Sequence, residues 1–306
     1  MTLHGIFPAL ATPFLAGGAI DWEALAFNLH AYNQINLAGY VVLGTSGEFP
    51  FLNDGERTQL IEFVRSQAAP GKIVVAGTGA ESTAEAIRRG REAADLGVDA
   101  VLVLPPHYFK GSMSEAALER HYRTVADALT IPLLLYNMPA NTGLNLSATL
   151  VKHLADHPRI VGLKDSGGNL TQLEEVLEGI PDRFSVFTGA GSLIFPALVM
   201  GASGAILAVA NVFPELCLAI YQAALEGEHE IARWLQLNLL ETNAAVTSRW
   251  GIAGMKRAMD LQGYRGGFPR LPILPFDPAL EDELRQILEK AERSSQPRGE
   301  GRPHNP

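Results

Sequence analysis

The chain has 306 residues, of which 47% are hydrophobic and 19% are charged, and its formal net charge is −9. This composition is typical of a globular protein with one large core or two smaller ones. The acidic balance argues against a nucleic-acid partner, and the single cysteine, Cys217, excludes an intramolecular disulfide. The sequence shows neither a signal peptide nor an apolar run of about 18 residues that could span a membrane, so we expect a cytoplasmic protein.

Eight short apolar runs recur along the chain at fairly even intervals. Each run is too short for a helix and is typical of a strand in a parallel sheet that is covered on both faces. The predicted strands begin at Gly5, Tyr40, Lys72, Ala100, Ile131, Ile160, Phe184 and Gly204.

Amphipathic stretches with helix-start signals lie between these runs. Asp21, Ser114 and Ser147 each precede such a stretch, and Ser82 with Glu85 predicts a capping box. Alternating strands and helices predict an α/β protein of the (β/α)8 TIM-barrel class, for which about 250 residues are typical. A doubly wound open sheet is the alternative, but it usually has fewer strands and a glycine-rich dinucleotide loop.

Four more helical stretches follow the eighth strand. We expect the barrel to occupy residues 1–212 and the later helices to form a C-terminal extension, residues 213–293, that packs on it. Residues 294–306 are rich in Pro, Gly and Arg and have no apolar periodicity, so a disordered tail is expected there.

Lys164 is the only lysine among the polar residues that follow the predicted strands, and in a TIM barrel the chemistry lies at these strand ends. Taken alone, Lys164 is compatible with a solvated side chain or with a partner of Asp165. The alternative is a nucleophile that forms a Schiff base with a carbonyl substrate. Such a lysine needs burial or polar neighbours that lower its pKa from about 10.4 towards about 7 to 8.

Two further strand ends could complete a site for a 2-oxo acid. Tyr136 ends the neighbouring fifth strand and has a phenol that can transfer protons. Thr45 and Ser46 offer hydroxyls and backbone N–H groups for a carboxylate, and Gly44 and Gly47 on either side permit a tight turn. Separately, each feature is also compatible with a core tyrosine or a simple helix entry. Together they predict one site.

The motifs GTSGE, YNMPANTG, GLKDSGG and GASGAILAVAN stand at the strand ends expected of a known family. The sequence resembles the dihydrodipicolinate synthase / N-acetylneuraminate lyase family, class I Schiff-base aldolases built as (β/α)8 barrels. On this resemblance Lys164 forms the imine and Tyr136 relays protons. Thr45 provides a relay hydroxyl, and the N–H groups of Thr45 and Ser46 bind the carboxylate. Tyr108 is implied to enter the neighbouring subunit's site, so a homodimer or homotetramer is expected.

The strand-five motif decides the expected branch of the family. Dihydrodipicolinate synthases carry an arginine two residues after the motif's proline, where this chain has Asn141, and an amide does not replace a bidentate guanidinium at a carboxylate site. The segments GEFPFL, ESTAEA, PANTGL and HPRIVGLKDSGGNLT look most like 4-hydroxy-2-oxoglutarate aldolases, which release pyruvate and glyoxylate. The implied substrate-binding residues are Thr45, Ser46, Asn141, Ser166, Gly189 and Ile206.

Three other functions remain open. The first is a dihydrodipicolinate synthase that condenses pyruvate with aspartate semialdehyde, and the second is a 2-keto-3-deoxy sugar-acid aldolase or dehydratase. The third is a binding protein that holds a 2-oxo acid without turnover, although such a protein is expected to lose Lys164 or Tyr136. No cofactor or metal is expected, because the protonated imine itself withdraws electrons and the eight histidines lack metal-ligand spacing.

Overall fold

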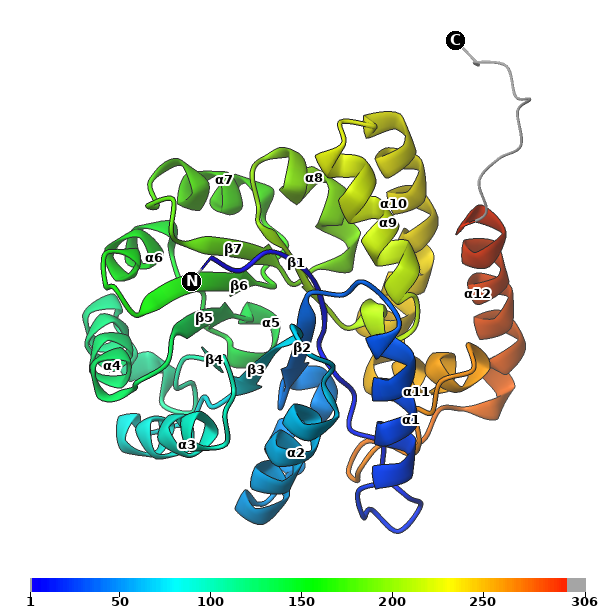
Figure 1. Ribbon diagram of the computed structural model, residues 1–306, viewed down its shortest axis with the longest axis horizontal. Helices are drawn as coiled ribbons and strands as arrows, with labels where there is room; N and C mark the ends of the chain where they lie inside the picture. Colours follow the sequence, from blue (N-terminus) through cyan, green and yellow to red (C-terminus); the bar gives the residue numbers. More distant parts are fainter. Residues whose placement is uncertain (1, 296–306) are drawn as a thin grey trace.

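The computed structural model describes residues 2–295 and shows a ring of parallel strands inside a ring of helices (Figure 1). The strands follow the order β1-β8-β7-β6-β5-β4-β3-β2, and a parallel bridge between Ala9 and Val41 joins the two remaining edges. The chain therefore forms a TIM barrel, as predicted. The strands are β1 (Gly5–Pro8), β2 (Gly39–Val42), β3 (Ile73–Gly77), β4 (Ala100–Val103), β5 (Leu133–Asn137), β6 (Ile160–Asp165), β7 (Ser185–Thr188) and β8 (Gly204–Leu207).

Helices surround the strands and continue beyond the last one. They are α1 (Trp22–Asn33), α2 (Asp54–Gln67), α3 (Thr83–Asp95), α4 (Glu115–Ala128), α5 (Pro139–Thr142), α6 (Ala148–Ala155), α7 (Leu170–Glu178), α8 (Ile194–Val199), α9 (Pro214–Leu225), α10 (His229–Ala244), α11 (Gly251–Leu261) and α12 (Glu281–Ser295). Within the described residues 2–295, no helix is both long and apolar enough to cross a membrane.

The N-caps confirm most of the predicted helix starts. The side chains of Asp21, Ser82, Ser114 and Ser147 each accept a hydrogen bond from a backbone N–H in the first turn of the helix that follows. Of the capping box predicted at Ser82, only the hydrogen bond from the Glu85 N–H to the Ser82 hydroxyl forms. The carboxylate of Glu85 binds Arg88 and Arg89 instead. A complete capping box lies at the start of α2, which the sequence pattern did not single out.

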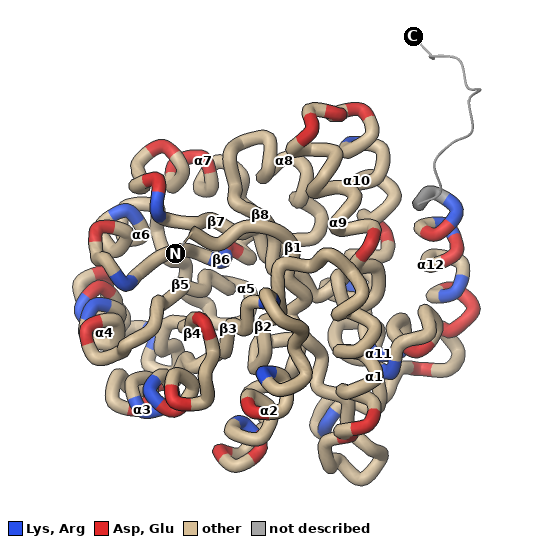
Figure 2. The backbone as a smooth tube through the Cα atoms, viewed as in Figure 1, with Lys and Arg blue, Asp and Glu red and all other residues tan. Residues whose placement is uncertain are grey.

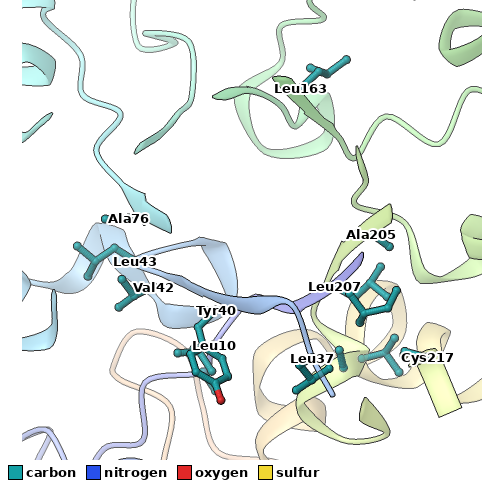
Figure 3. Packing of buried hydrophobic residues seen from close by; sticks show 14 of the residues in the cluster. Leu10, Leu37, Tyr40, Val42, Leu43, Ala76, Leu163, Ala205, Leu207 and Cys217 are labelled. Carbon is teal, nitrogen blue, oxygen red and sulfur yellow. The ribbon is translucent and has the colours of Figure 1, made fainter. Parts of the chain in front are cut away.

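The core has two layers, separated by the sheet. One layer packs the outward side chains of the strands against the helices, and Figure 3 shows part of it, from Tyr40 of β2 to Leu207 of β8 and Cys217 of α9. The other fills the barrel interior and includes Phe7, Val41, Leu134, Tyr136, Val161, Phe187 and Ile206. Charged residues lie mainly on the outer helices, whereas the strands carry few of them (Figure 2). A lysine on a strand is therefore an exception to the pattern.

The last helices extend the barrel on one side, where α12 lies at the edge of the molecule (Figure 1). Helix α9 packs against β1 and α8, while α10 packs against α9, α12 and the turn after β7. A π-helical turn, Ala245–Arg249, joins α10 to α11. The division at residue 212 stays a prediction. Helix α12 continues to Ser295, past the predicted start of the tail, and residues 296–306 lie outside the described part of the chain.

The buried His121 on α4 predicts an acid-sensitive fold. Its Nδ1 lies 2.9 Å from the Thr83 hydroxyl of α3, its Nε2 has no hydrogen-bond partner within the described residues, and burial lowers its pKa from 6.5 to about 4. The folded state therefore binds fewer protons than the unfolded state between these values. We expect the free energy of unfolding to be constant, for this residue, above pH 6.5 and to fall by about 3 kcal/mol as the pH drops to 4.

Urea denaturation across this pH range measures the effect. A His121→Asn variant, which keeps a polar atom near Thr83, should have a shallower pH dependence than the parent. If the free energy of unfolding depends on pH equally in the two proteins, His121 does not couple protonation to folding.

Candidate active site

Lys164 and Tyr136 face each other across two neighbouring strands. They are partners in the parallel register of β5 and β6, and each is 3% exposed. The Lys164 ammonium lies 4.2 Å from the centroid of the Tyr136 ring. Within the described residues Lys164 makes no ion pair, so the interpretation in which it pairs with Asp165 or points to solvent is wrong. Burying a lysine without a carboxylate partner costs free energy, and such residues are concentrated at functional sites.

Asp165 is held by its own neighbours. Its Oδ1 accepts hydrogen bonds from the Asn137 side chain at 2.8 Å and from the Gly167 N–H at 2.9 Å. Burial raises the pKa of Asp165, and these two hydrogen bonds oppose that rise. Asn137 also accepts the N–H of Leu146. The pair therefore ties the end of β6 to the end of β5, which keeps Lys164 opposite Tyr136.

The Tyr136 phenol contacts the turn after β2. Its oxygen lies 3.2 Å from the Thr45 hydroxyl, and either group can be the donor. Burial raises the pKa of Tyr136, but the charge of Lys164 and polar contacts with Thr45, Lys164 and Ser166 outweigh it, so the pKa lies below 10.0. A phenol with a lowered pKa and a hydroxyl partner can pass a proton between the lysine and a bound substrate.

The turn that carries Thr45 and Ser46 is tight for a different reason from the one predicted. Thr45–Gly47 form a 3₁₀ turn, but the left-handed residues around it are Leu43, with φ 59°, and Glu48, with φ 55°. Gly44 has φ −82°, which any residue can adopt. The turn is thus held by its packing rather than permitted by its glycines, which indicates local strain near the predicted site.

The ends of β6 and β7 approach each other closely beside Lys164. A Cβ at Gly189 would lie 1.9 Å from the Ser166 hydroxyl and 3.2 Å from Lys164 Cε, so any larger residue there would displace the Ser166 side chain. The predicted residues Gly189 and Ser166 therefore border the lysine. Ile206 of β8 is 2% exposed and belongs to the same interior cluster as Tyr136.

A small cavity of about 10 Å³, room for roughly one water molecule, lies beside Tyr136 at the ends of β2, β3 and β4. Its lining is mainly apolar and comprises Leu43, Gly44, Phe49, Gly77, Gly79, Leu102, Leu104 and Tyr136. Within the described residues there is no cluster of three His, Cys, Asp or Glu side chains that could hold a metal ion. The expectation that the protein needs no metal stays a prediction.

Two of the predicted residues do not join this cluster in the single chain. Asn141, on the short helix α5, is exposed and its side chain has no hydrogen bond within the described residues. Tyr108, on the loop after β4, is 76% exposed and packs edge-to-face on Phe109. Glu81 holds that loop, because its Oε2 accepts the N–H groups of His107 and Tyr108 at 2.9 and 2.8 Å.

A TIM barrel whose strand ends bring a buried lysine, a tyrosine and a threonine into contact defines a class I aldolase-type enzyme, and the comparisons with known proteins agree. The chain belongs to the dihydrodipicolinate synthetase family, whose family model matches residues 2–291.

Relatives and solved structures match the chain over nearly its whole length. The chain is 34% identical over 286 residues to a 4-hydroxy-tetrahydrodipicolinate synthase of Exiguobacterium, covering 94% of this chain and 97% of that protein. The structure of the enzyme of that name from Methylacidiphilum fumariolicum superposes with a TM-score of 0.90 at 31% identity, covering 96% and 97% of the two chains. A dihydrodipicolinate synthase from Acinetobacter baumannii, solved with pyruvate, gives 0.90 at 30% identity, covering 95% and 99%.

Sequence reasoning missed how the C-terminal extension reaches the site. The side chain of Gln236 on α10 donates to the carbonyl of Gly191 at 2.9 Å and accepts the N–H of Phe195 at 3.0 Å, so it holds the loop after β7. Lys256 on α11 forms an ion pair with Glu48, at the end of the GTSGE motif. Only Glu48 carried a signal in the sequence, because it follows a strand end. Nothing in the helical pattern marked Lys256 or Gln236.

Proposed function

We propose that the protein is a lyase that cleaves 4-hydroxy-2-oxoglutarate to pyruvate and glyoxylate through an imine on Lys164. The family membership supports the pyruvate chemistry. The observation that carries the choice of substrate is Asn141, an exposed amide at the position where the resemblance places the synthases' arginine.

In the proposed mechanism the unprotonated amine of Lys164 attacks C2 of the 2-oxo acid. Tyr136 transfers a proton to the carbinolamine oxygen, which leaves as water, and the iminium forms. Removal of the C4 hydroxyl proton through Tyr136 and Thr45 then breaks the C3–C4 bond and releases glyoxylate. The remaining enamine is protonated at C3, and water hydrolyses the pyruvate imine to free Lys164. The iminium accepts the electron pair of the broken bond.

The substrate's first carboxylate is proposed to bind the N–H groups of Thr45 and Ser46. The ammonium of Lys110 is a candidate cation for its second carboxylate. It lies next to Gly143, the residue after α5: a Cβ added to this glycine would be 3.3 Å from it. Asn141, Ser166, Gly189 and Ile206 are proposed to shape the rest of the pocket. This arrangement supports a dicarboxylic 2-oxo acid as the substrate class.

A specific observation favours a second candidate. Relatives that are 34% identical to the chain carry the name 4-hydroxy-tetrahydrodipicolinate synthase, and these names favour condensation of pyruvate with aspartate semialdehyde over the cleavage that we propose. Both reactions use the same lysine and the same enamine, so they differ only in the group that meets α5. A 2-keto-3-deoxy sugar acid is a third substrate for the same pocket.

A substrate panel separates these reactions. Pyruvate release from 4-hydroxy-2-oxoglutarate and from a 2-keto-3-deoxy sugar acid is followed with a coupled dehydrogenase, and condensation is followed with pyruvate and aspartate semialdehyde. We expect cleavage of 4-hydroxy-2-oxoglutarate to have the highest kcat/KM. If condensation alone proceeds, the protein is a synthase and our proposal is wrong.

Replacing Asn141 by arginine tests whether this residue contacts the distal half of the substrate. Arginine adds bulk and a second cation beside Lys110, so we expect Asn141→Arg to lower kcat/KM for 4-hydroxy-2-oxoglutarate by about tenfold, or about 1.4 kcal/mol. Borohydride trapping of pyruvate on Lys164 should be unchanged, because pyruvate does not reach α5. A gain in condensation with aspartate semialdehyde at unchanged cleavage would contradict the role of Asn141.

We further propose a homodimer or homotetramer in which Tyr108 enters the neighbouring subunit's site as part of the proton relay. The exposed pair of Tyr108 and Phe109 supports this, because large apolar side chains that protrude together are typical of interfaces.

A further inference from the structure

The glutamate that ends the GTSGE motif closes the turn that carries Thr45 and Ser46. Glu48 is 1% exposed and has left-handed backbone angles, φ 55° and ψ 36°. A residue other than glycine keeps this conformation only where its surroundings hold it. Its N–H donates to the carbonyl of Thr45 at 3.0 Å. The position of the Glu48 side chain therefore affects the geometry of the turn.

Two residues of the C-terminal extension hold the Glu48 carboxylate. Its Oε1 lies 2.5 Å from the ammonium of Lys256 on α11, and its Oε2 accepts the backbone N–H of Arg270 at 2.8 Å. Lys256 is 1% exposed and also donates to the carbonyls of Thr12 and Phe268, at 2.8 and 2.7 Å. Two hydrogen bonds to carbonyls and the ion pair with Glu48 thus fix the position of the ammonium.

The same network holds the turn from a second side. The hydroxyl of Thr12, whose carbonyl binds Lys256, donates to the carbonyl of Gly47 at 2.8 Å. The guanidinium of Arg270 donates to the carbonyl of Phe51 at 2.8 Å and pairs with Glu56 at the start of α2. The loops after β1 and β2 therefore meet the extension at one cluster of charges, of which Lys256 and Glu48 are buried and Arg270 and Glu56 partly buried.

Stability alone is a weak reason for this arrangement. The desolvation free energy of two buried charges offsets much of the attraction between them. Well-packed apolar residues at the same positions therefore often stabilise a core equally well. A buried pair does specify where one side chain lies. Here that side chain belongs to the residue three positions after Thr45, whose hydroxyl lies 3.2 Å from the Tyr136 phenol.

We propose that Lys256 is a positioning residue of the active site: through Glu48 it holds the Thr45–Ser46 turn against Tyr136 and towards the substrate carboxylate. The helical extension thereby forms part of the catalytic unit. This inference rests on the proposed covalent use of Lys164, but not on the identity of the aldehyde that leaves.

The test uses pyruvate alone, so that it does not depend on the distal half of the substrate. Borohydride trapping on the full-length protein gives the rate of imine formation at each pyruvate concentration, and thermal unfolding is measured in parallel. Lys256→Met is expected to slow trapping by about a hundredfold, the effect of a misplacement of roughly 1 Å. Because this variant leaves Glu48 buried without its cation, a second variant, Glu48→Gln with Lys256→Met, removes both charges.

The double variant should unfold at nearly the parent's temperature and still need about tenfold more pyruvate for half-maximal trapping. Lys290→Met, which breaks the exposed ion pair between α12 and Glu241 of α10, is the matched control and should trap like the parent. A folded double variant with the parent's pyruvate dependence would overturn the positioning role, as would a double variant that does not fold. If the parent itself traps no pyruvate, the proposed function and this inference both fall, whereas normal trapping in all variants overturns the inference alone.

Discussion

Lys164→Met is expected to abolish imine formation and to reduce turnover by about 10⁴- to 10⁶-fold, the range seen when a nucleophile is removed. Methionine has nearly the length of lysine but no amine, so no carbinolamine can form. Because the ammonium is 3% exposed and has no ion pair among the described residues, its removal should not lower stability. Peptide mass analysis after borohydride reduction with pyruvate should find the adduct on Lys164 in the parent and nowhere in the variant.

The control for this prediction is Lys152→Met on the outer helix α6, whose ammonium lies 3.9 Å from Glu178. It removes the same group from the surface and should leave trapping and turnover unchanged. A borohydride adduct that persists in folded Lys164→Met protein would place the imine on another amine and would invalidate the mechanism above.

Tyr136→Phe is expected to lower kcat by about 10²- to 10⁴-fold, the usual contribution of general acid–base catalysis. The change removes only the phenol oxygen and keeps the ring on which the Lys164 ammonium lies, at 4.2 Å. Imine formation should therefore become slow but remain detectable, because Lys164 still attacks while water leaves without its proton donor. Single-turnover trapping kinetics with pyruvate separate this slow step from substrate binding.

Tyr40→Phe is the matched control. Tyr40 is also a buried tyrosine on a barrel strand, but its hydroxyl donates to Asn33 at 2.7 Å on the outer side of the sheet. Loss of that hydrogen bond should cost about 1 kcal/mol of stability and leave kcat unchanged. Equal losses of kcat in the two variants would indicate that Tyr136 supports the fold rather than the proton transfer.

Local patterns in the sequence were enough to predict the barrel fold. Each apolar run between helical stretches is buried on both faces, and each observed strand begins within two residues of its predicted start. The rule that barrel chemistry lies at strand ends then selected Lys164 and Tyr136, which the register of β5 and β6 makes direct partners. Helices α2, α5, α7 and α8 were not singled out in the sequence; α5 and α8 have only four and six residues, too few for a clear periodicity.

Contacts between distant segments decided what the pattern could not. Gly44 and Gly47 suggested a turn made possible by glycine, yet the left-handed residues are Leu43 and Glu48. The carboxylate of Glu48 pairs with Lys256, 208 residues later in the chain. No local signal predicts such a pair, since the sequence carries periodicity and motifs but not the distances between side chains that folding brings together.

The sequence by itself therefore determined the barrel and pointed to Lys164 as the candidate nucleophile at a strand end, because these follow from burial patterns and motifs within single elements. Only the tertiary structure decided that Lys164 is buried without a carboxylate partner, that Tyr136 contacts Thr45, and that the extension holds the turn after β2. Each of these depends on packing between elements far apart in the chain.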